Sequence, residues 1–194
     1  MTVTPLAHDP AVFFPQPPAS SQAVLERLGV PARFFLFVGS GDPRKNLPLI
    51  PQALTRARLE EPLVVAGWSG WDGRDMPGNV IQLGHVADAD LAALYSRAVG
   101  LVLPSVYEGF GLPLVEAMAC GCPLVISPAA SLPEVAGDAA LVMRDPHDVE
   151  HLSTLLARLS QDEQLCAQLS TLGLRRAQSF SWEITAQKTY KALL

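Results

Sequence analysis

The 194-residue chain has few charged residues for its size. Aspartate, glutamate, lysine and arginine make up 17% of it, and the formal net charge is −5. A protein that binds nucleic acid generally needs a positively charged surface, so this composition argues against that class. Hydrophobic residues make up 49% of the chain, more than a disordered protein carries. We therefore expect a chain that folds around a hydrophobic core and has no nucleic-acid partner.

Cysteine is also scarce, and long apolar runs are absent. The three cysteines, Cys120, Cys122 and Cys166, are too few for a disulfide scaffold and are odd in number. We interpret the Cys-x-Cys pair as small buried side chains rather than metal ligands. No apolar run reaches the roughly 20 residues of a transmembrane helix, and residues 1–21 lack the basic start of a signal peptide. These features predict a cytoplasmic protein.

Prolines dominate the beginning of the chain. They stand at Pro5, Pro10, Pro15, Pro17, Pro18 and Pro31, and they oppose regular structure there. We predict that residues 1–32 form a leader or interdomain linker outside the core. Within it we expect one short helix over 22–28, with Ser21 as its N-cap and Gly29 as its end. Residues 33–194 are predicted to form one domain with helices at its C-terminal end.

Short apolar segments alternate with helical segments through that domain. The predicted strands are 33–38, 62–66, 80–83, 100–103, 123–126 and 140–143. The predicted helices are 47–58, 88–98, 113–120, 132–136, 147–159, 162–179 and 182–194. This alternation predicts an α/β fold, a Rossmann-like doubly wound parallel sheet of about six strands with helices on both faces. Ligands of such folds bind at the carboxyl ends of the strands, so the loops there are the candidate site.

The loop after the first predicted strand reads Gly-Ser-Gly-Asp-Pro-Arg-Lys-Asn over residues 39–46. Glycines allow backbone N–H groups to approach an anion, and a following helix N-terminus adds positive potential. Lys45 is one of three lysines and the only one before Lys188. A phosphate site and a solvated turn explain this loop equally well. The pattern matches neither a Walker A loop nor G-x-G-x-x-G.

The loop after the fourth predicted strand carries two acids, Glu108 and Glu116, around a Gly-Phe-Gly sequence. Carboxylates accept hydrogen bonds, and the hydroxyls of a sugar or ribose can donate them. Alternatively, Glu108 is an exposed loop acid and Glu116 is favoured by the nearby helix N-terminus. These alternatives account well for either glutamate alone, but less well for both glutamates around one Gly-Phe-Gly sequence. We therefore interpret the pair as a binding site for a polyhydroxylated ligand.

Residues 104–148, from Pro-Ser-Val-Tyr-Glu-Gly-Phe-Gly onward, resemble the retaining group 1 glycosyltransferases of the GT-B fold. The hallmark of that family is two glutamates separated by seven residues, which Glu108 and Glu116 match. Residues 37–47 resemble the family's phosphate loop, and residues 83–98 resemble the segment beside the nucleobase. The resemblance covers about residues 34–194, in the family's order. It implies one half of a GT-B fold.

The resemblance also assigns roles to the candidate residues. It implies that Lys45 and Arg44 bind the donor diphosphate and act with Glu108, which orients the transferred sugar, as the catalytic residues. Glu116 would accept hydrogen bonds from the ribose hydroxyls. Many relatives carry an arginine at the position of Ser40. We expect Arg44 to take over the role of that arginine in this chain. The other positions would act mainly through their backbones: Gly39 and Ser40 at the diphosphate, Gly84, His85 and Val86 beside the base, and Gly109, Phe110, Gly111 and Leu112 at the sugar and distal phosphate.

The implied activity is transfer of a mannosyl or glucosyl unit from an NDP-sugar to an acceptor hydroxyl. The donor would be of the GDP-mannose or UDP-glucose type, with no metal or other cofactor. The chain resembles only the C-terminal, donor-binding half of such enzymes. The acceptor-binding N-terminal domain is absent, and any peripheral membrane contact would be made through that missing half. We therefore expect that the isolated chain is inactive. In such enzymes the C-terminal helix, here predicted over residues 182–194, normally crosses back toward the N-terminal domain.

Two alternatives remain. The chain could be a non-catalytic nucleotide-sugar-binding subunit that needs a partner chain, or an epimerase acting on NDP-sugars. Weaker candidates are the pair His147 and His151, which we interpret as surface residues, and Glu134, which we interpret as a helix-end residue. Trp68 and Trp71 are interpreted as loop anchors rather than as a stacking platform for a sugar or base.

Overall fold

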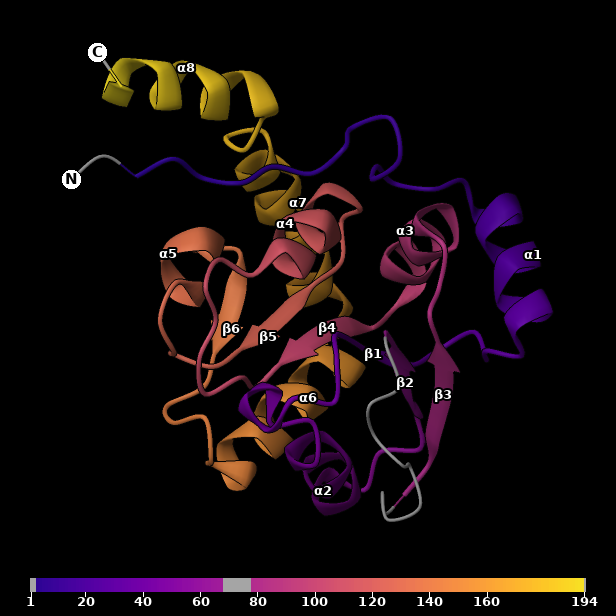
Figure 1. Cartoon of the computed structure of the whole chain (residues 1–194). Helices are drawn as coiled ribbons and strands as arrows, with labels where there is room; N and C mark the ends of the chain where they lie inside the picture. Colours follow the sequence, from indigo (N-terminus) through magenta and orange to yellow (C-terminus); the bar gives the residue numbers. More distant parts are fainter. Residues whose placement is uncertain (1–2, 68–77, 194) are drawn as a thin grey trace.

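The computed structural model describes residues 3–67 and 78–193, and it contains one parallel sheet. Its six strands lie in the order β3-β2-β1-β4-β5-β6 (Figure 1). In chain order they are β1 (Phe35–Val38), β2 (Leu63–Ala66), β3 (Val80–Gly84), β4 (Gly100–Leu103), β5 (Leu124–Ile126) and β6 (Ala140–Val142). The predicted Rossmann-like fold and its parallel sheet are confirmed.

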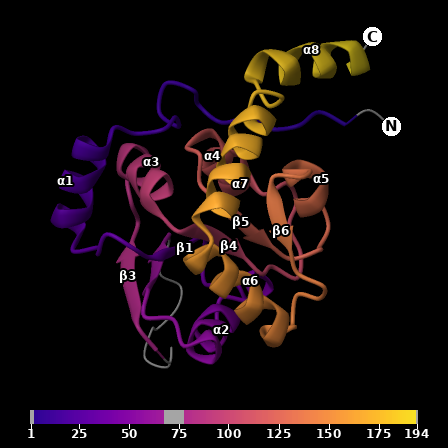
Figure 2. The same ribbon diagram turned by 180° about the vertical axis from the view of Figure 1, so that it is seen from behind.

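Helices cover both faces of this sheet. They are α1 (Pro18–Leu28), α2 (Leu49–Ala57), α3 (Asp88–Arg97), α4 (Leu112–Ala119), α5 (Leu132–Ala136), α6 (Val149–Gln161), α7 (Glu163–Ala177) and α8 (Trp182–Leu193), with a 3-10 turn η1 (Pro43–Lys45). Helices α2 and α6 pack together on one face. Helices α3, α4 and α5 cover the other face, where α1 packs on α3 and α7 packs on α4 (Figures 1 and 2).

The central strands are buried on both sides, which explains their unbroken apolar sequences. Every residue of β1, β4 and β5 is buried. Strand β1 pairs with β2 on one side and β4 on the other, so that Phe35 lies opposite both Leu63 and Gly100. The chain leaves β1 toward α2 and leaves β4 toward α4, on opposite faces. The order of the sheet reverses at this point, and a ligand crevice is expected there.

The proline-rich leader belongs to the core, so the prediction that residues 1–32 lie outside it is wrong. Ala7, Phe13, Leu25 and Val30 are all buried. Proline lacks a backbone donor, which opposes regular hydrogen bonding but does not oppose burial of neighbouring side chains. The leader therefore crosses the domain as an irregular segment that is packed through its apolar residues.

Helix α1 begins earlier than the predicted 22–28. Proline fits the first turn of a helix, and α1 starts at Pro18. Ser21 is therefore inside the helix, where its hydroxyl donates to the carbonyl oxygens of Pro17 and Pro18 instead of capping it. The helix ends as predicted at Gly29, which has a left-handed conformation (φ 68°).

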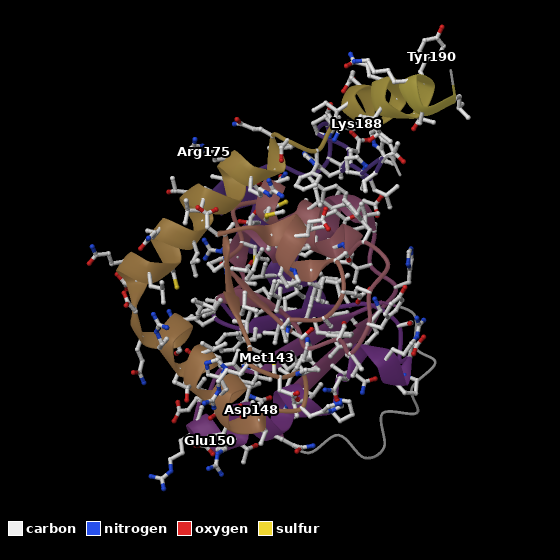
Figure 3. The ribbon with its side chains drawn as sticks, turned by 90° about the vertical axis from the view of Figure 1, so that its left-hand side faces the viewer. Met143, Asp148, Glu150, Arg175, Lys188 and Tyr190 are labelled. Carbon is white, nitrogen blue, oxygen red and sulfur yellow. The ribbon has the colours of Figure 1, made fainter. Side chains whose placement is uncertain are left out.

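Helix α8 projects beyond the body of the domain. Figure 3 shows Lys188 and Tyr190 on this helix, at the opposite end of the molecule from Asp148 and Glu150. None of its described side chains is buried. It meets the leader, because the Thr185 hydroxyl donates to the Pro5 carbonyl oxygen at 2.6 Å. Within residues 3–67 and 78–193, no helix is long and apolar enough to cross a membrane.

The burial of the leader leads to a prediction about stability. Phe13 is 6% exposed and its neighbour Phe14 is 44% exposed. Phe13→Ala is expected to lower the free energy of unfolding by about 3 kcal/mol or more, because it removes a buried aromatic ring. Phe14→Ala is the matched control and should change it by less than about 1 kcal/mol. Urea denaturation of the two variants measures both values. Equal stabilities would show that the leader does not belong to the folded unit.

Candidate functional site

The loops after β1 and β4 meet at the predicted crevice. The backbone N–H of Val106 donates to the carbonyl oxygen of Arg44 at 2.7 Å, which ties the two loops directly. These are the loops that carry the Pro-Arg-Lys-Asn and Gly-Phe-Gly sequences. Sequence elements about 60 residues apart therefore form one surface at the carboxyl edge of the sheet.

Lys45 and Glu108 form an ion pair in the centre of this surface. The Lys45 Nζ lies 2.6 Å from the Glu108 Oε1, and the two side chains are only 20% and 10% exposed. The hydroxyl of Ser105 donates to the same carboxylate oxygen at 2.8 Å. Glu108 is further held through its carbonyl oxygen, which accepts from the Ser131 hydroxyl. The ammonium carries three N–H donors, so its bond to Glu108 leaves donors for an anionic ligand.

Arg44 has different surroundings from Lys45. Its side chain is 62% exposed and forms an ion pair with Asp42, with 2.7 Å between Nη2 and Oδ2. Asp42 also accepts from the Arg44 backbone N–H, and these contacts lower the pKa of the Asp42 carboxyl below its ordinary value. The structure thus brings Lys45 and Glu108 together and pairs Arg44 with Asp42. Asp42 was not among the residues predicted for the site.

The turn that contains these residues begins before the predicted helix 47–58. Residues 43–45 form η1, and α2 starts only at Leu49. Asn46 separates them in a left-handed conformation (φ 52°), and its side-chain amide donates to the Pro146 carbonyl oxygen at 2.7 Å. This anchor holds the loop that presents Lys45.

The glycines after β1, β2 and β3 lie against one another. The Gly39 N–H donates to the Ala66 carbonyl oxygen at 3.0 Å, and the Gly67 N–H donates to the Gly84 carbonyl oxygen at 2.7 Å. A Cβ atom on Gly67 would overlap the carbonyl oxygen of Gly39. The backbones that follow β1, β2 and β3 therefore approach one another closely at the carboxyl edge of the sheet. Gly39 and Gly84 were predicted to belong to the site, and Gly67 was missed.

Glu116 lies on α4 and is held from α3. The Tyr95 hydroxyl donates to its Oε2 at 3.0 Å. Burial raises the pKa of the Glu116 carboxyl above its ordinary value, while the Tyr95 hydrogen bond acts in the opposite direction and the charge of Asp88 raises it further. Sequence reasoning placed Tyr95 on the predicted helix 88–98 but did not link it to the site. Only the packing of α3 on α4 makes that link.

The Gly-Phe-Gly loop leads directly into α4. Gly111 is the N-cap of α4 in a left-handed conformation (φ 88°), and a Cβ there would crowd Leu132. The Phe110 ring packs edge-on against Phe180, with 5.9 Å between centroids, so it anchors the loop to the end of α7. At the start of α4, Pro113 has no backbone N–H, and the Leu114 N–H donates to the carbonyl oxygen of Gly111 at 2.9 Å. Gly109, Phe110 and Gly111 lead into the start of α4 at Leu112, and the contact of these backbones with a ligand stays a prediction.

The remaining predicted positions surround this centre or lie apart from it. Ser40 is half-buried in the loop after β1, and His85 is exposed and Val86 buried just after β3. His151 accepts the Arg144 N–H at its Nδ1, which gives it a structural contact. Trp68 and Trp71 lie outside the described residues. Across the part of the chain that the structure describes, no cluster of three or more metal-ligating side chains occurs.

The cysteines are placed as the sequence predicts. Cys120 and Cys122 are buried, and burial raises the pKa of the Cys120 thiol to about 12 and that of Cys122 further still. A thiol with so high a pKa is neutral and unreactive near pH 7. Both therefore act as small core residues.

Comparison with known proteins shows the family. The model of the glycosyl transferases group 1 family matches residues 26–176, and the chain belongs to this family. It is 38% identical to O-antigen chain mannosyltransferase B of Escherichia coli over 93% of this chain and 51% of that protein. It is 44% identical to the MMP alpha-(1->4)-mannosyltransferase of Mycolicibacterium hassiacum over 54% of this chain and 26% of that protein.

Solved structures show the same fold. The sucrose-phosphate synthase of Thermosynechococcus elongatus superimposes with a TM-score of 0.82 at 27% identity, over 98% of this chain and 52% of that one. The C-terminal domain of the group 1 protein LpcC of Francisella tularensis superimposes with a TM-score of 0.74 at 21% identity, over 89% of this chain and 97% of that domain. The chain thus spans about half the length of O-antigen chain mannosyltransferase B. It spans a smaller share of the other curated relatives.

Proposed function

We propose that this chain is the donor-binding domain of a retaining hexosyltransferase that uses an NDP-sugar, with a GDP-mannose-type donor favoured. The observation that carries the proposal is the shielded pair of Lys45 and Glu108 beside the N-terminus of α4, at the switch point of the sheet. A cation and a helix N-terminus suit a diphosphate, while the two carboxylates suit the sugar and ribose hydroxyls on either side of it.

The diphosphate is bound between the two loops. Lys45 donates to its oxygens, and backbone N–H groups of residues 109–112 donate from the opposite wall. Arg44 turns from Asp42 toward the ligand, which its exposure permits. The Gly39 and Ser40 backbone lies beneath it. These groups stabilise the negative charge that develops on the leaving diphosphate, which is their contribution to catalysis.

The sugar and nucleoside occupy the two sides of the diphosphate. Glu108 holds the sugar hydroxyls and orients the anomeric carbon toward the acceptor. Glu116 accepts from the ribose, and the backbone of Gly84, His85 and Val86 borders the base. A mannosyl donor is supported by the relatives that are named mannosyltransferases. A UDP-sugar is the alternative donor, because a solved neighbour with the same fold is described in complex with UDP-glucose.

Transfer requires a second domain in this proposal. The chain covers 51% of its Escherichia coli relative and 52% of the sucrose-phosphate synthase chain. We infer that the acceptor site is formed by an N-terminal domain or a partner chain. The isolated chain is therefore expected to bind the donor and to release no transferred sugar.

Calorimetric titration with GDP, UDP, GDP-mannose and UDP-glucose tests the proposal. One base series is expected to bind, and Glu116→Gln should weaken it about 10-fold because a charged acceptor for the ribose is lost. Glu26→Gln is the matched control, since Glu26 is exposed on α1. Binding that is equal in Glu116→Gln and in the unaltered chain would remove Glu116 from the site. Sugar transfer by the isolated chain would contradict the need for a second domain.

A further inference from the structure

We propose that Tyr95 is a positioning residue of the donor site: its buried hydroxyl fixes the Glu116 carboxylate so that one oxygen faces the ribose. This inference rests on the proposed function, which assigns Glu116 to the ribose hydroxyls. The hydrogen bond crosses from α3 to α4. Helix α3, which follows the residues proposed to border the base, therefore also positions the acid proposed to bind the ribose.

The geometry leaves the tyrosine little freedom. Tyr95 is completely buried, and its hydroxyl lies 3.0 Å from the Glu116 Oε2. Its ring packs edge-on against Phe13 of the leader, with 6.2 Å between centroids and 62° between planes. The leader is held in place beside it, because the Gln16 N–H donates to the Ser96 hydroxyl at 3.0 Å. A ring enclosed in this way presents its hydroxyl in one direction.

The direction of this hydrogen bond is defined. Burial and the Glu116 charge raise the pKa of the Tyr95 phenol well above its ordinary value, so the phenol stays protonated and donates. It occupies Oε2 of Glu116, and no side chain in the described part of the chain donates to Oε1. Oε1 is therefore available as the acceptor for a ligand hydroxyl.

The surrounding charges make this hydrogen bond important for the protonation of Glu116. Burial and Asp88, at the start of α3, both raise the pKa of its carboxyl, and the Tyr95 hydroxyl lowers it. Cys120 lies at the end of α4 and is neutral, with a pKa of about 12. Removing the Tyr95 hydroxyl leaves only the influences that favour the protonated acid. A protonated Glu116 loses part of its capacity to accept from a diol.

Tyr95→Phe is the variant that tests the inference, because it keeps the ring and removes only the hydroxyl. We expect the dissociation constant of the preferred nucleotide to rise about 10-fold at pH 7. The pKa of Glu116 in the ligand-free chain, followed by the carbon NMR signal of its carboxyl, should increase. As the pH is lowered, nucleotide affinity should therefore begin to fall at a higher pH in Tyr95→Phe than in the unaltered chain. Tyr190→Phe, on the exposed α8, should change none of these quantities.

A double-mutant cycle separates positioning from a general structural effect. In the Glu116→Ala background, which removes the acceptor of the Tyr95 hydroxyl, Tyr95→Phe should have little further effect on nucleotide affinity. An equal loss in both backgrounds, or an unchanged affinity and Glu116 pKa in Tyr95→Phe, would overturn the inference. In either case the proposed function stands if Glu116→Gln weakens binding. If the unaltered chain binds no nucleotide, the proposed function fails and the positioning role fails with it.

Discussion

Replacing Lys45 with alanine is expected to weaken binding of a nucleoside diphosphate about 100-fold, because a charge-assisted hydrogen bond contributes about 1.5–3 kcal/mol. The substitution also leaves Glu108, whose side chain is 10% exposed, without its cation beside the negative ligand. Both consequences act on the diphosphate, so the ratio of the GDP and GMP affinities should fall. For a uridine-specific site the same comparison uses UDP and UMP.

Two further lysine variants make this result specific. Lys45→Arg keeps the positive charge and should recover part of the affinity, although the larger planar group fits the space beside Ser105 less well. Lys191→Ala removes a charge from the exposed α8 and should have no effect. Calorimetry gives the affinities, and thermal melts show that each variant is folded. A folded Lys45→Ala chain with the original affinity would contradict the assignment of Lys45 to the diphosphate.

Gly67→Ala is expected to lower the free energy of unfolding by about 3 kcal/mol or more, through backbone strain and overlap. The φ angle of Gly67 is 139°, a conformation that side chains oppose, and its Cβ would overlap the Gly39 carbonyl oxygen. The overlap can be relieved only if the loops after β1 and β2 separate. We therefore expect nucleotide affinity to fall together with stability.

Gly109→Ala is the matched control for stability. A Cβ at Gly109 would meet no atom within 4 Å, and this glycine lacks a positive φ. Its melting temperature should stay close to that of the unaltered chain, while that of Gly67→Ala should decrease. Equal melting temperatures for the two variants would show that the contact of Gly67 with Gly39 does not constrain the fold.

The sheet and the centre of the site could be predicted because both follow from local patterns. Runs such as Phe35–Val38 are apolar throughout because these strands are buried on both faces. Once the strands are known to be parallel, their carboxyl ends share one edge. The loops that carry Lys45 and Glu108 must then lie near each other, and the ion pair between them is observed.

Other features depend on packing that no local pattern encodes. The contact of Tyr95 with Glu116 requires the rotation of α3 against α4, and the contact of Gly67 with Gly39 requires the exact spacing of two loops. The proline-rich leader was predicted to lie outside the core because its prolines oppose regular structure. Phe13 shows the physical error, since an irregular backbone can still bury its side chains.

Arg44 illustrates a third limit. The sequence places two cations side by side, and a resemblance alone assigns both to the diphosphate. In the structure only Lys45 contacts Glu108, while Arg44 is paired with Asp42 at the surface. The partner of an exposed arginine depends on a local turn, here η1, whose geometry the sequence did not predict. The contribution of Arg44 to donor binding is therefore expected to be smaller than that of Lys45.

Backbone amide NMR shifts, followed during titration with the preferred nucleoside diphosphate, show directly whether the ligand binds beside the Lys45–Glu108 pair. We expect the largest changes at residues 39–46, 84–86 and 105–112, together with an indirect effect at Tyr95. Lys45→Ala should reduce all of them at a fixed ligand concentration. Changes that cluster instead around Arg33 and Arg97, near the amino ends of β1 and β4, would contradict a donor site at the Lys45–Glu108 pair. They would place the nucleotide at the opposite edge of the sheet from the Lys45–Glu108 pair.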